Sequence, residues 1–263
     1  MLRRSLFIAL LVCGSLLRAQ DAASLSPEEI ATAATGESIS LPMPGELFAA
    51  LGKHGKPDWS AMARKTPAST FTNRQQIALN LGGLIADGYL AVEAQDAQQV
   101  KNAARDIKML AKGLGVEQDL INRGNSIIEF AEKAQWATLR EELEAAQNEV
   151  ITAMTAHQDQ DLVTLVMLGG WLRGTEVVST HIAAHYSEGS ARVLRQPAVL
   201  QHFVQKLATM PKKISDTPLL NIVRAGLAEI QKTILSPKLT ESDVKMLSEL
   251  TQTVMRAVVF KDK

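Results

Sequence analysis

The chain has 263 residues, of which 46% are hydrophobic, 4% aromatic and 21% charged, and its 28 basic residues balance its 28 acidic residues. Nucleic acids and anionic membranes select clustered positive charge. The composition therefore argues against both as partners.

The first 20 residues have the three parts of a signal peptide. Arg3 and Arg4 form a basic start, an apolar stretch covers 6–17, and Ala19 offers a small residue at a cleavage point. The stretch is shorter than the roughly 20 apolar residues that a transmembrane helix needs. We therefore expect export, with cleavage after Ala19 or Gln20, and no transmembrane helix in the mature chain.

The only cysteine, Cys13, lies in this segment. Lipidation at Cys13 is an alternative fate, but Val12 stands where a lipoprotein signal usually has a small residue. The mature chain would lack disulfides, which favours a bacterial periplasm over eukaryotic secretion, although full release from the cell is also compatible. Three arginines leave with the signal peptide, so 25 basic residues face 28 acidic ones, a net charge of −3.

The segment 21–70 reads as an irregular arm that lies over the main body. A serine followed by proline and two glutamates predicts a short helix over 26–36. A second short helix is expected over 46–52. We expect Phe48 and Trp59 to anchor the arm on the main body through their apolar rings.

The remainder, 71–263, is predicted to be a single helical domain. Apolar residues recur at helical spacing, capping residues precede the patterns, and no stretch alternates with the period of a strand. We therefore expect an all-α, multi-helix bundle of about eight main helices. The predicted helices span 72–94, 96–114, 117–133, 136–157, 158–186, 197–210, 217–235 and 240–260.

The sequence Leu-Gly-Gly occurs at 81–83 and again at 168–170, each time inside a long apolar pattern. The recurrence suggests a duplication of two four-helix halves, 72–157 and 158–260. Because leucine and glycine are common residues, coincidence is the alternative.

The glycine pairs also have a mechanical interpretation that needs no duplication. A glycine inside a helix costs roughly 0.5–1 kcal/mol relative to alanine, so two consecutive glycines need a compensating gain. Close approach of a second helix would supply it. We predict that the two Leu-Gly-Gly helices cross at 82–83 and 169–170, with a kink at each pair as the alternative.

Four polar residues interrupt these two apolar helices, and they are the candidate ligand-binding residues: Asn80, Asp87, Arg173 and Glu176. Arg173 and Glu176 share a helix face, and Asp87 becomes a cross-helix partner for Arg173 if the glycine pairs meet. The group is either a structural ion-pair network or the polar floor of a pocket in which Arg173 grips an anion.

His181 and His185 stand one helical turn apart, a spacing that can hold zinc or copper. A metal site needs a third ligand, for which Glu188, His157 and His202 are candidates. Alternatively, the histidines stabilise the carboxyl end of their helix.

The chain carries no sequence signature of a serine hydrolase, a nucleotide-binding enzyme or a c-type cytochrome. We therefore expect a non-catalytic binding or interaction protein of the bacterial periplasm, whose partner is a small molecule or a protein. A metal-binding protein that uses His181 and His185 and a structural subunit of a cell-envelope assembly are the alternatives.

Overall fold

The computed structural model describes residues 41–64 and 71–260, and within these ranges the chain forms helices and no strand. The all-α prediction is therefore confirmed for this part of the chain. The predicted signal peptide, Cys13 and the predicted helix over 26–36 lie outside the described residues.

The helices follow the predicted patterns closely. In chain order they are α2 (Pro44–Gly52), α3 (Arg74–Glu93), α4 (Ala97–Leu114), α5 (Ile121–Glu132), α6 (Trp136–Ala156), α7 (Gln160–Ala184), α8 (Glu188–Ala191), α9 (Pro197–Thr209), α10 (Lys212–Ser215), α11 (Pro218–Ile234) and α12 (Glu241–Val259), with short 3-10 helices η1 (Ser60–Met62), η2 (Gln118–Leu120) and η3 (Arg192–Leu194).

Two details differ from the sequence prediction. The expected helix over 117–133 is divided into η2 and α5. The short helices α8 and α10, which were not predicted, and α2, which was predicted as part of the arm, bring the number within 41–64 and 71–260 above the expected eight.

Local sequence explains where the long helices begin and end. The side chain of Asn73 caps α3 by accepting hydrogen bonds from two backbone N–H groups, and Asp96 caps α4 in the same way. Thr240 and Asp243 form a reciprocal capping box at the start of α12. Gly115 ends α4 with a φ of 83°, a left-handed conformation that glycine adopts without strain.

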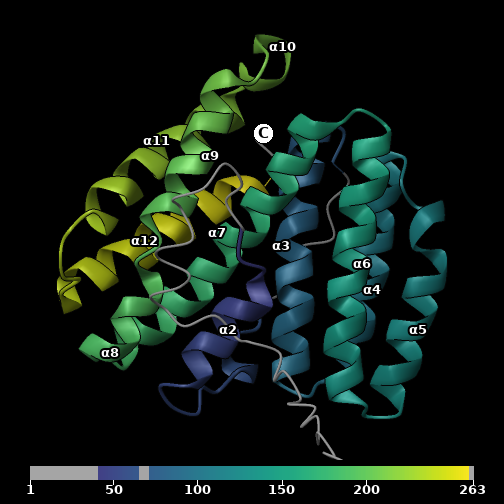
Figure 1. The fold of residues 1–263 in the computed structure, drawn as a ribbon, viewed down its shortest axis with the longest axis horizontal. Helices are drawn as coiled ribbons and strands as arrows, with labels where there is room; N and C mark the ends of the chain where they lie inside the picture. The colour runs from purple at the N-terminus through teal and green to yellow at the C-terminus, as the bar shows by residue number, and fades with distance from the viewer. Residues whose placement is uncertain (1–40, 65–70, 261–263) are drawn as a thin grey trace, which may run out of the picture.

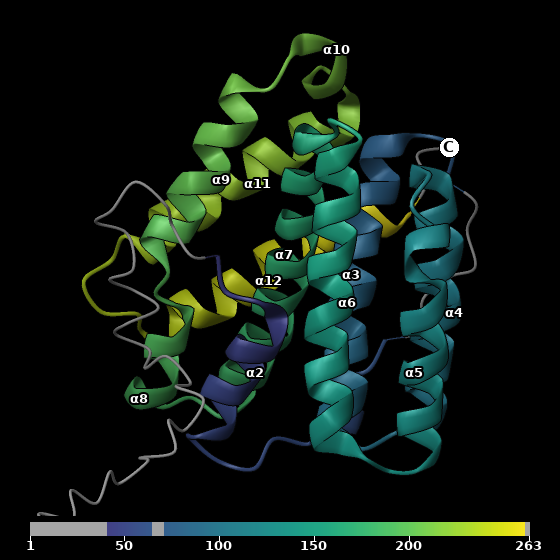
Figure 2. The same cartoon turned by 45° about the vertical axis from the view of Figure 1, so that its right-hand side comes forward.

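Helices α3 and α7 lie side by side in the middle of the molecule (Figures 1 and 2). They cross at the glycines, because a Cβ added to Gly82 would overlap the carbonyl oxygen of Val166, and one added to Gly169 would overlap that of Leu79. Both helices continue through their glycine pairs. The predicted crossing is therefore confirmed.

The other long helices form two groups on either side of this crossing (Figure 1). Helices α4, α5 and α6 complete a four-helix bundle with α3. On the other side, α12 and α9 pack against α7, and α11 packs against α12 and α9. The order of neighbours differs, since α3 packs along α4 but α7 packs along α12 rather than α9. The structure does not confirm the predicted duplication.

The arm rests on the central helices through α2, which packs against α7 and α3. Phe48 is fully buried, and the ring of Trp59 lies 5.6 Å from it, centroid to centroid. The two expected anchors thus contact one another as well as the core.

In the part of the chain that the structure describes, α7 is the one helix long and apolar enough to cross a membrane. Of its most apolar 18-residue stretch, 83% is buried inside the protein. A core helix meets the same criteria of length and composition, and the burial of α7 fits a core helix.

Candidate functional site

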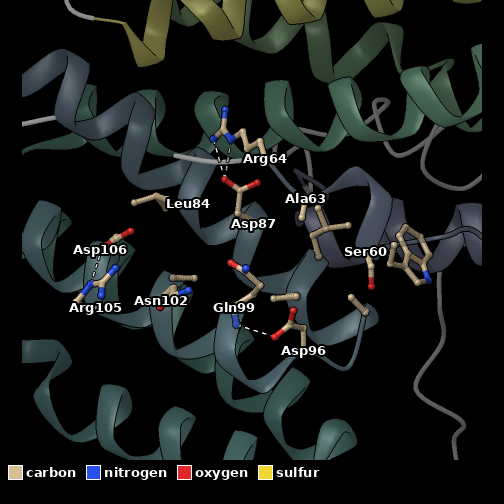
Figure 3. A pocket seen from close by; sticks show the side chains of 15 residues that line it. Ser60, Ala63, Arg64, Leu84, Asp87, Asp96, Gln99, Asn102, Arg105 and Asp106 are labelled. Atoms are coloured by element: carbon tan, nitrogen blue, oxygen red, sulfur yellow. Dashed lines mark hydrogen bonds and ion pairs between the residues drawn. The ribbon is translucent and has the colours of Figure 1, made fainter. Parts of the chain in front are cut away.

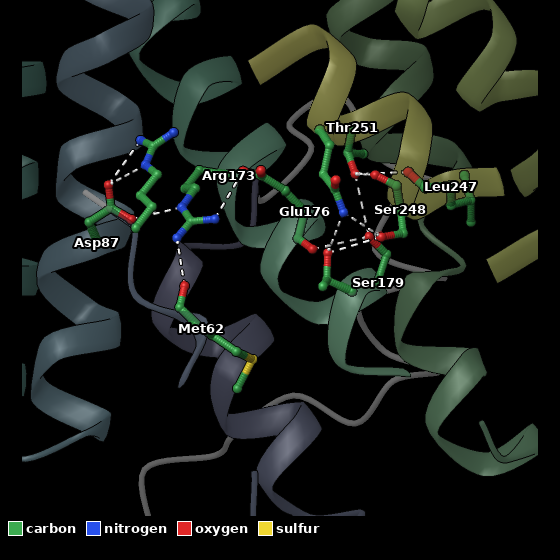
Figure 4. A network of polar contacts seen from close by, with 11 residues as sticks. Met62, Asp87, Arg173, Glu176, Ser179, Leu247, Ser248 and Thr251 are labelled. Carbon is green, nitrogen blue, oxygen red and sulfur yellow. Dashed lines mark hydrogen bonds and ion pairs between the residues drawn. The ribbon is translucent and has the colours of Figure 1, made fainter. Parts of the chain in front are cut away.

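Arg173 is the centre of a buried polar network (Figure 4). Its Nε donates to Oδ1 of Asp87 at 2.7 Å, its Nη1 to Oε2 of Glu176 at 3.0 Å, and its Nη2 to the carbonyl oxygen of Met62 at 3.0 Å. The Arg173 side chain is only 5% exposed. The expected pairing of Asp87 with Arg173 across the two helices is therefore present.

Arg64, from the arm, completes this network and was not expected from the sequence. Its Nε and Nη2 both lie 2.9 Å from Oδ2 of Asp87, so that each carboxylate oxygen contacts a different arginine. Burial opposes ionisation of Arg173, but the carboxylates of Asp87 and Glu176 outweigh it and raise the pKa of its guanidinium. All the charges of the network are thus neutralised within the protein.

The fourth candidate, Asn80, lies apart from this network. Its side-chain amide donates to the carbonyl oxygens of Val258 at 2.7 Å and Gln76 at 2.9 Å. Asn80 therefore joins the middle of α3 to the end of α12. The structure brings three of the four candidates together and leaves the fourth at a separate helix contact.

A polar cleft of about 470 Å³ opens beside the network (Figure 3). Asp87 and Arg64 line one side, and Gln99 and Asn102 of α4 line the other. Asp87 is already held by two arginines, as described above. Arg173 itself does not line this cleft, so the cleft does not support the predicted grip of Arg173 on an anion.

The histidine pair lies at the carboxyl end of α7. The two rings stack with their centroids 4.8 Å apart, and Nδ1 of His185 is 3.2 Å from the carbonyl oxygen of His181. Burial, and then the neighbouring His185, lower the pKa of His181. Glu188, a proposed third ligand, pairs with Lys238 at 2.6 Å. Within 41–64 and 71–260, no three His, Cys, Asp or Glu residues are placed to share a metal ion.

A second cavity, of about 290 Å³, lies inside the α3–α6 bundle. Its walls are mostly aliphatic. The cavity exists because each of the four helices has at least one small residue in its wall, at a position where a larger side chain would fill the space. The cavity is lined by Ile85, Val100, Ile107, Leu120, Ile127 and Leu143, and by the small residues Gly88, Ala103, Ala104, Gly124 and Ala146.

The glycines confirm that this space is open. A Cβ added to Gly124 would meet no atom within 4 Å, and one added to Gly88 would meet only Leu143 and Ala103, at ordinary contact distances of 3.9–4.0 Å. Helix α5 closes one side of the cavity with few buried residues of its own, Ile127 and Ala131. Arg123 of α5 ties it to α6 through Glu142 and Glu149.

The lining also includes polar side chains: Arg105, Lys108, Arg123 and Asn125 are partly or well exposed, whereas Gln147 is buried. It is 7% exposed, and its Oε1 is buried without a hydrogen-bond partner in the described structure. Gln147 was not among the residues predicted from the sequence. Gln147 lies four residues after Leu143 and three before Val150, which places it on the apolar face of α6. A polar residue on the apolar face of a helix is the sequence signal that could have identified Gln147 as a candidate.

Comparisons with protein-family models, with curated proteins and with solved structures gave no match. The function is therefore argued from the geometry of the sites. The polar network is satisfied within the protein, whereas the apolar cavity has open space and a wall residue, Gln147, whose Oε1 has no hydrogen-bond partner in the described structure.

Proposed function

We propose that the chain is an exported, non-catalytic binding protein that holds a small apolar molecule in the cavity of the α3–α6 bundle. The observation that carries the proposal is the cavity of about 290 Å³ and its lining of small residues from all four helices. Pockets that hold small ligands are mostly apolar and begin at about 300 Å³. The volume is therefore at the lower end of that range.

The mostly apolar lining favours an occupant. The cavity is partly open to the surface, so water can enter it, but water finds few hydrogen-bond partners against aliphatic walls. An apolar ligand would displace this water and remove the apolar walls from contact with it, which is favourable.

Export remains part of the proposal through the signal peptide over 1–20, with the periplasm as the compartment. In that compartment, the protein would carry or store a molecule that is poorly soluble in water. The interpretation of Asp87, Arg173 and Glu176 that fits best with this function is structural, because together with Arg64 their charges neutralise one another beside the central crossing.

Titration with the fluorescent apolar probe N-phenyl-1-naphthylamine tests the proposal. We expect saturable binding of one probe per chain. Replacement Gly124→Leu would place a side chain in the cavity and should weaken binding about tenfold or more. Gly52→Leu is the matched control, because a Cβ at Gly52, at the end of α2 and away from the cavity, also meets no atom within 4 Å. Absence of saturable binding, or equal binding by the Gly124 variant, would contradict the proposal.

Native mass spectrometry of the exported chain, purified without chelator, identifies what the protein carries. We expect an excess mass that is lost on denaturation and that matches a small organic molecule. A mass excess equal to zinc or copper would instead support the metal-binding alternative at His181 and His185. An apo mass with a defined oligomer would favour the structural-subunit alternative.

A further inference from the structure

Gln147, the buried polar residue in the cavity wall, indicates which functional group the ligand carries. We propose that the molecule held in the α3–α6 cavity carries an uncharged hydroxyl group, which hydrogen-bonds to the side-chain amide of Gln147. This inference rests on the proposed binding function and adds the class of ligand to it.

Gln147 has a hydrogen-bonding atom without a partner in the described structure. Its Oε1 is buried and has no partner within 41–64 and 71–260, and the residue as a whole is 7% exposed. Leu143 and Val150, on the same face of α6, are nearly fully buried, so Gln147 sits where the helix otherwise presents aliphatic side chains. A buried acceptor without a donor is unfavourable, and a ligand that supplies the donor removes that cost.

The charged side chains around the cavity favour an uncharged ligand. The cavity is lined by no carboxylate from the described ranges, so an ammonium group would find no counter-ion there. The cations at its rim are already paired. Arg105 lies 3.0 Å from Asp106, Lys108 lies 4.0 Å from Glu117, and Arg123 contacts two glutamates of α6. An anionic ligand would have to compete with those carboxylates, so a neutral polar group fits best.

Among neutral polar groups, a hydroxyl suits the side-chain amide of Gln147 best. The end of a glutamine side chain has an acceptor oxygen and a donor NH₂. A hydroxyl both donates and accepts, so it satisfies whichever end of the Gln147 amide faces it. An ether or ketone can only accept, and it would leave Oε1 unsatisfied.

The size of the cavity limits the rest of the molecule. At about 30 Å³ for each water-sized group, about 290 Å³ holds on the order of ten non-hydrogen atoms. The class is therefore a medium-chain alcohol or a small ring system with one hydroxyl. Gln147 also lines a smaller cavity of about 170 Å³ beside Trp171 and Phe203, so the experiment must show which cavity the hydroxyl ligand occupies.

Decan-1-ol and 1-methoxynonane provide the test, since they have the same number of non-hydrogen atoms and only the alcohol can donate. The affinity of each is measured by displacement of N-phenyl-1-naphthylamine from the wild-type chain and from Gln147→Met, which keeps the shape and removes the amide. The different hydration of the two ligands cancels when the alcohol-to-ether ratio is compared between the two proteins. We expect this ratio to fall about 2- to 10-fold in the variant, the usual worth of one neutral hydrogen bond.

The outcomes separate the two proposals. An unchanged ratio in Gln147→Met, with both ligands still bound, would overturn the hydroxyl inference and leave the binding function standing. Failure of the probe and of both ligands to bind the wild-type chain would overturn the binding function itself. Full alcohol preference in Gly124→Leu would place the hydroxyl ligand in the smaller cavity and would also overturn the inference. Gln147→Leu serves as a second apolar variant if Gln147→Met does not fold.

Discussion

Helix α3 carries glycines with opposite roles six residues apart. Gly82 lies at the crossing with α7, where a Cβ would overlap the backbone of Val166. Gly88 lies on the cavity of the α3–α6 bundle, where a Cβ would meet only ordinary contacts at 3.9–4.0 Å. At the crossing, glycine allows two backbones to touch, and at the cavity it leaves space that the protein itself does not fill. The same residue type therefore permits backbone contact between helices at one position and lines a cavity at the other.

The largest expected effect comes from alanine at the crossing. Gly82→Ala should destabilise the protein by about 4–5 kcal/mol, beyond the usual range for overpacking, because the obstructing atoms belong to a backbone and cannot rotate away. Urea denaturation followed by circular dichroism measures the change. Gly88→Ala on the same helix is the control and should remain folded with no loss of stability. Equal destabilisation by both variants would remove the distinction between the two regions.

The next largest loss of stability is expected from removing an arginine of the polar network beside the crossing. Arg173→Ala should cost about 3–4 kcal/mol, because it leaves Asp87 and Glu176 partly buried without their shared cation. Arg64→Ala should cost less, since the Arg64 side chain is 19% exposed and water can replace it. Both costs are measured by urea denaturation.

The same two variants separate the structural interpretation of the network from a ligand-binding one. If the network is structural, a folded Arg173→Ala protein should still bind the apolar probe in the α3–α6 cavity. Loss of probe binding by a stably folded Arg173→Ala protein would tie the network to the ligand instead.

A smaller effect, of opposite sign, is expected at the cavity. Gly124→Ala should stabilise the protein by about 0.5–1 kcal/mol, because it removes a glycine from the interior of α5 and its Cβ enters open space. Differential scanning calorimetry measures the melting temperature of the variant and of the wild-type chain, each without and with N-phenyl-1-naphthylamine. A destabilised Gly124→Ala protein would mean that the cavity is already filled or collapsed in solution.

The smallest effect lies at the end of α7, away from both regions. Because burial and His185 lower the pKa of His181 in the folded state, the unfolded chain takes up this proton at higher pH. The contribution of His181 to stability is therefore fully present above pH 6.5 and declines as the pH falls below that value. Urea midpoints at pH 7.5 and 5.5 should show a smaller decline for His181→Asn than for the wild-type chain. An identical decline would assign the pH dependence to other groups.

Local signals in the sequence were sufficient for most of the fold. The pattern over 136–157 predicted α6 (Trp136–Ala156) nearly to the residue, and the acidic cap at Asp96 and the glycine at 115 correctly bounded α4. These features depend on residues within one turn of each other. The prediction was less accurate over 117–133, where η2 interrupts the helix before α5, since the choice between a 3-10 turn and an α-turn follows from contacts with α6.

The candidate site was only partly predictable. Asp87 and Arg173 could be paired in advance, because the glycine pairs fixed where the two helices cross and both residues lie near that point. Arg64 could not be added, since it belongs to the arm, and its position depends on how α2 and the following turn lie on the core. Asn80 was grouped with them because of its polarity, although its face of α3 is turned toward α12.

The sequence by itself determined the helices, the crossing at the glycine pairs and the polar residues that flank it, because each depends on spacing along one helix or on the cost of glycine within it. Only the tertiary structure decided where space remains. The cavity beside Gly88, Gly124 and Gln147 is produced by small side chains on four helices that meet at one place, and the sequence of a single helix does not show that the small residues of the other three lie opposite. Packing is a property of the assembled helices, and a void is visible only when all of its walls are present.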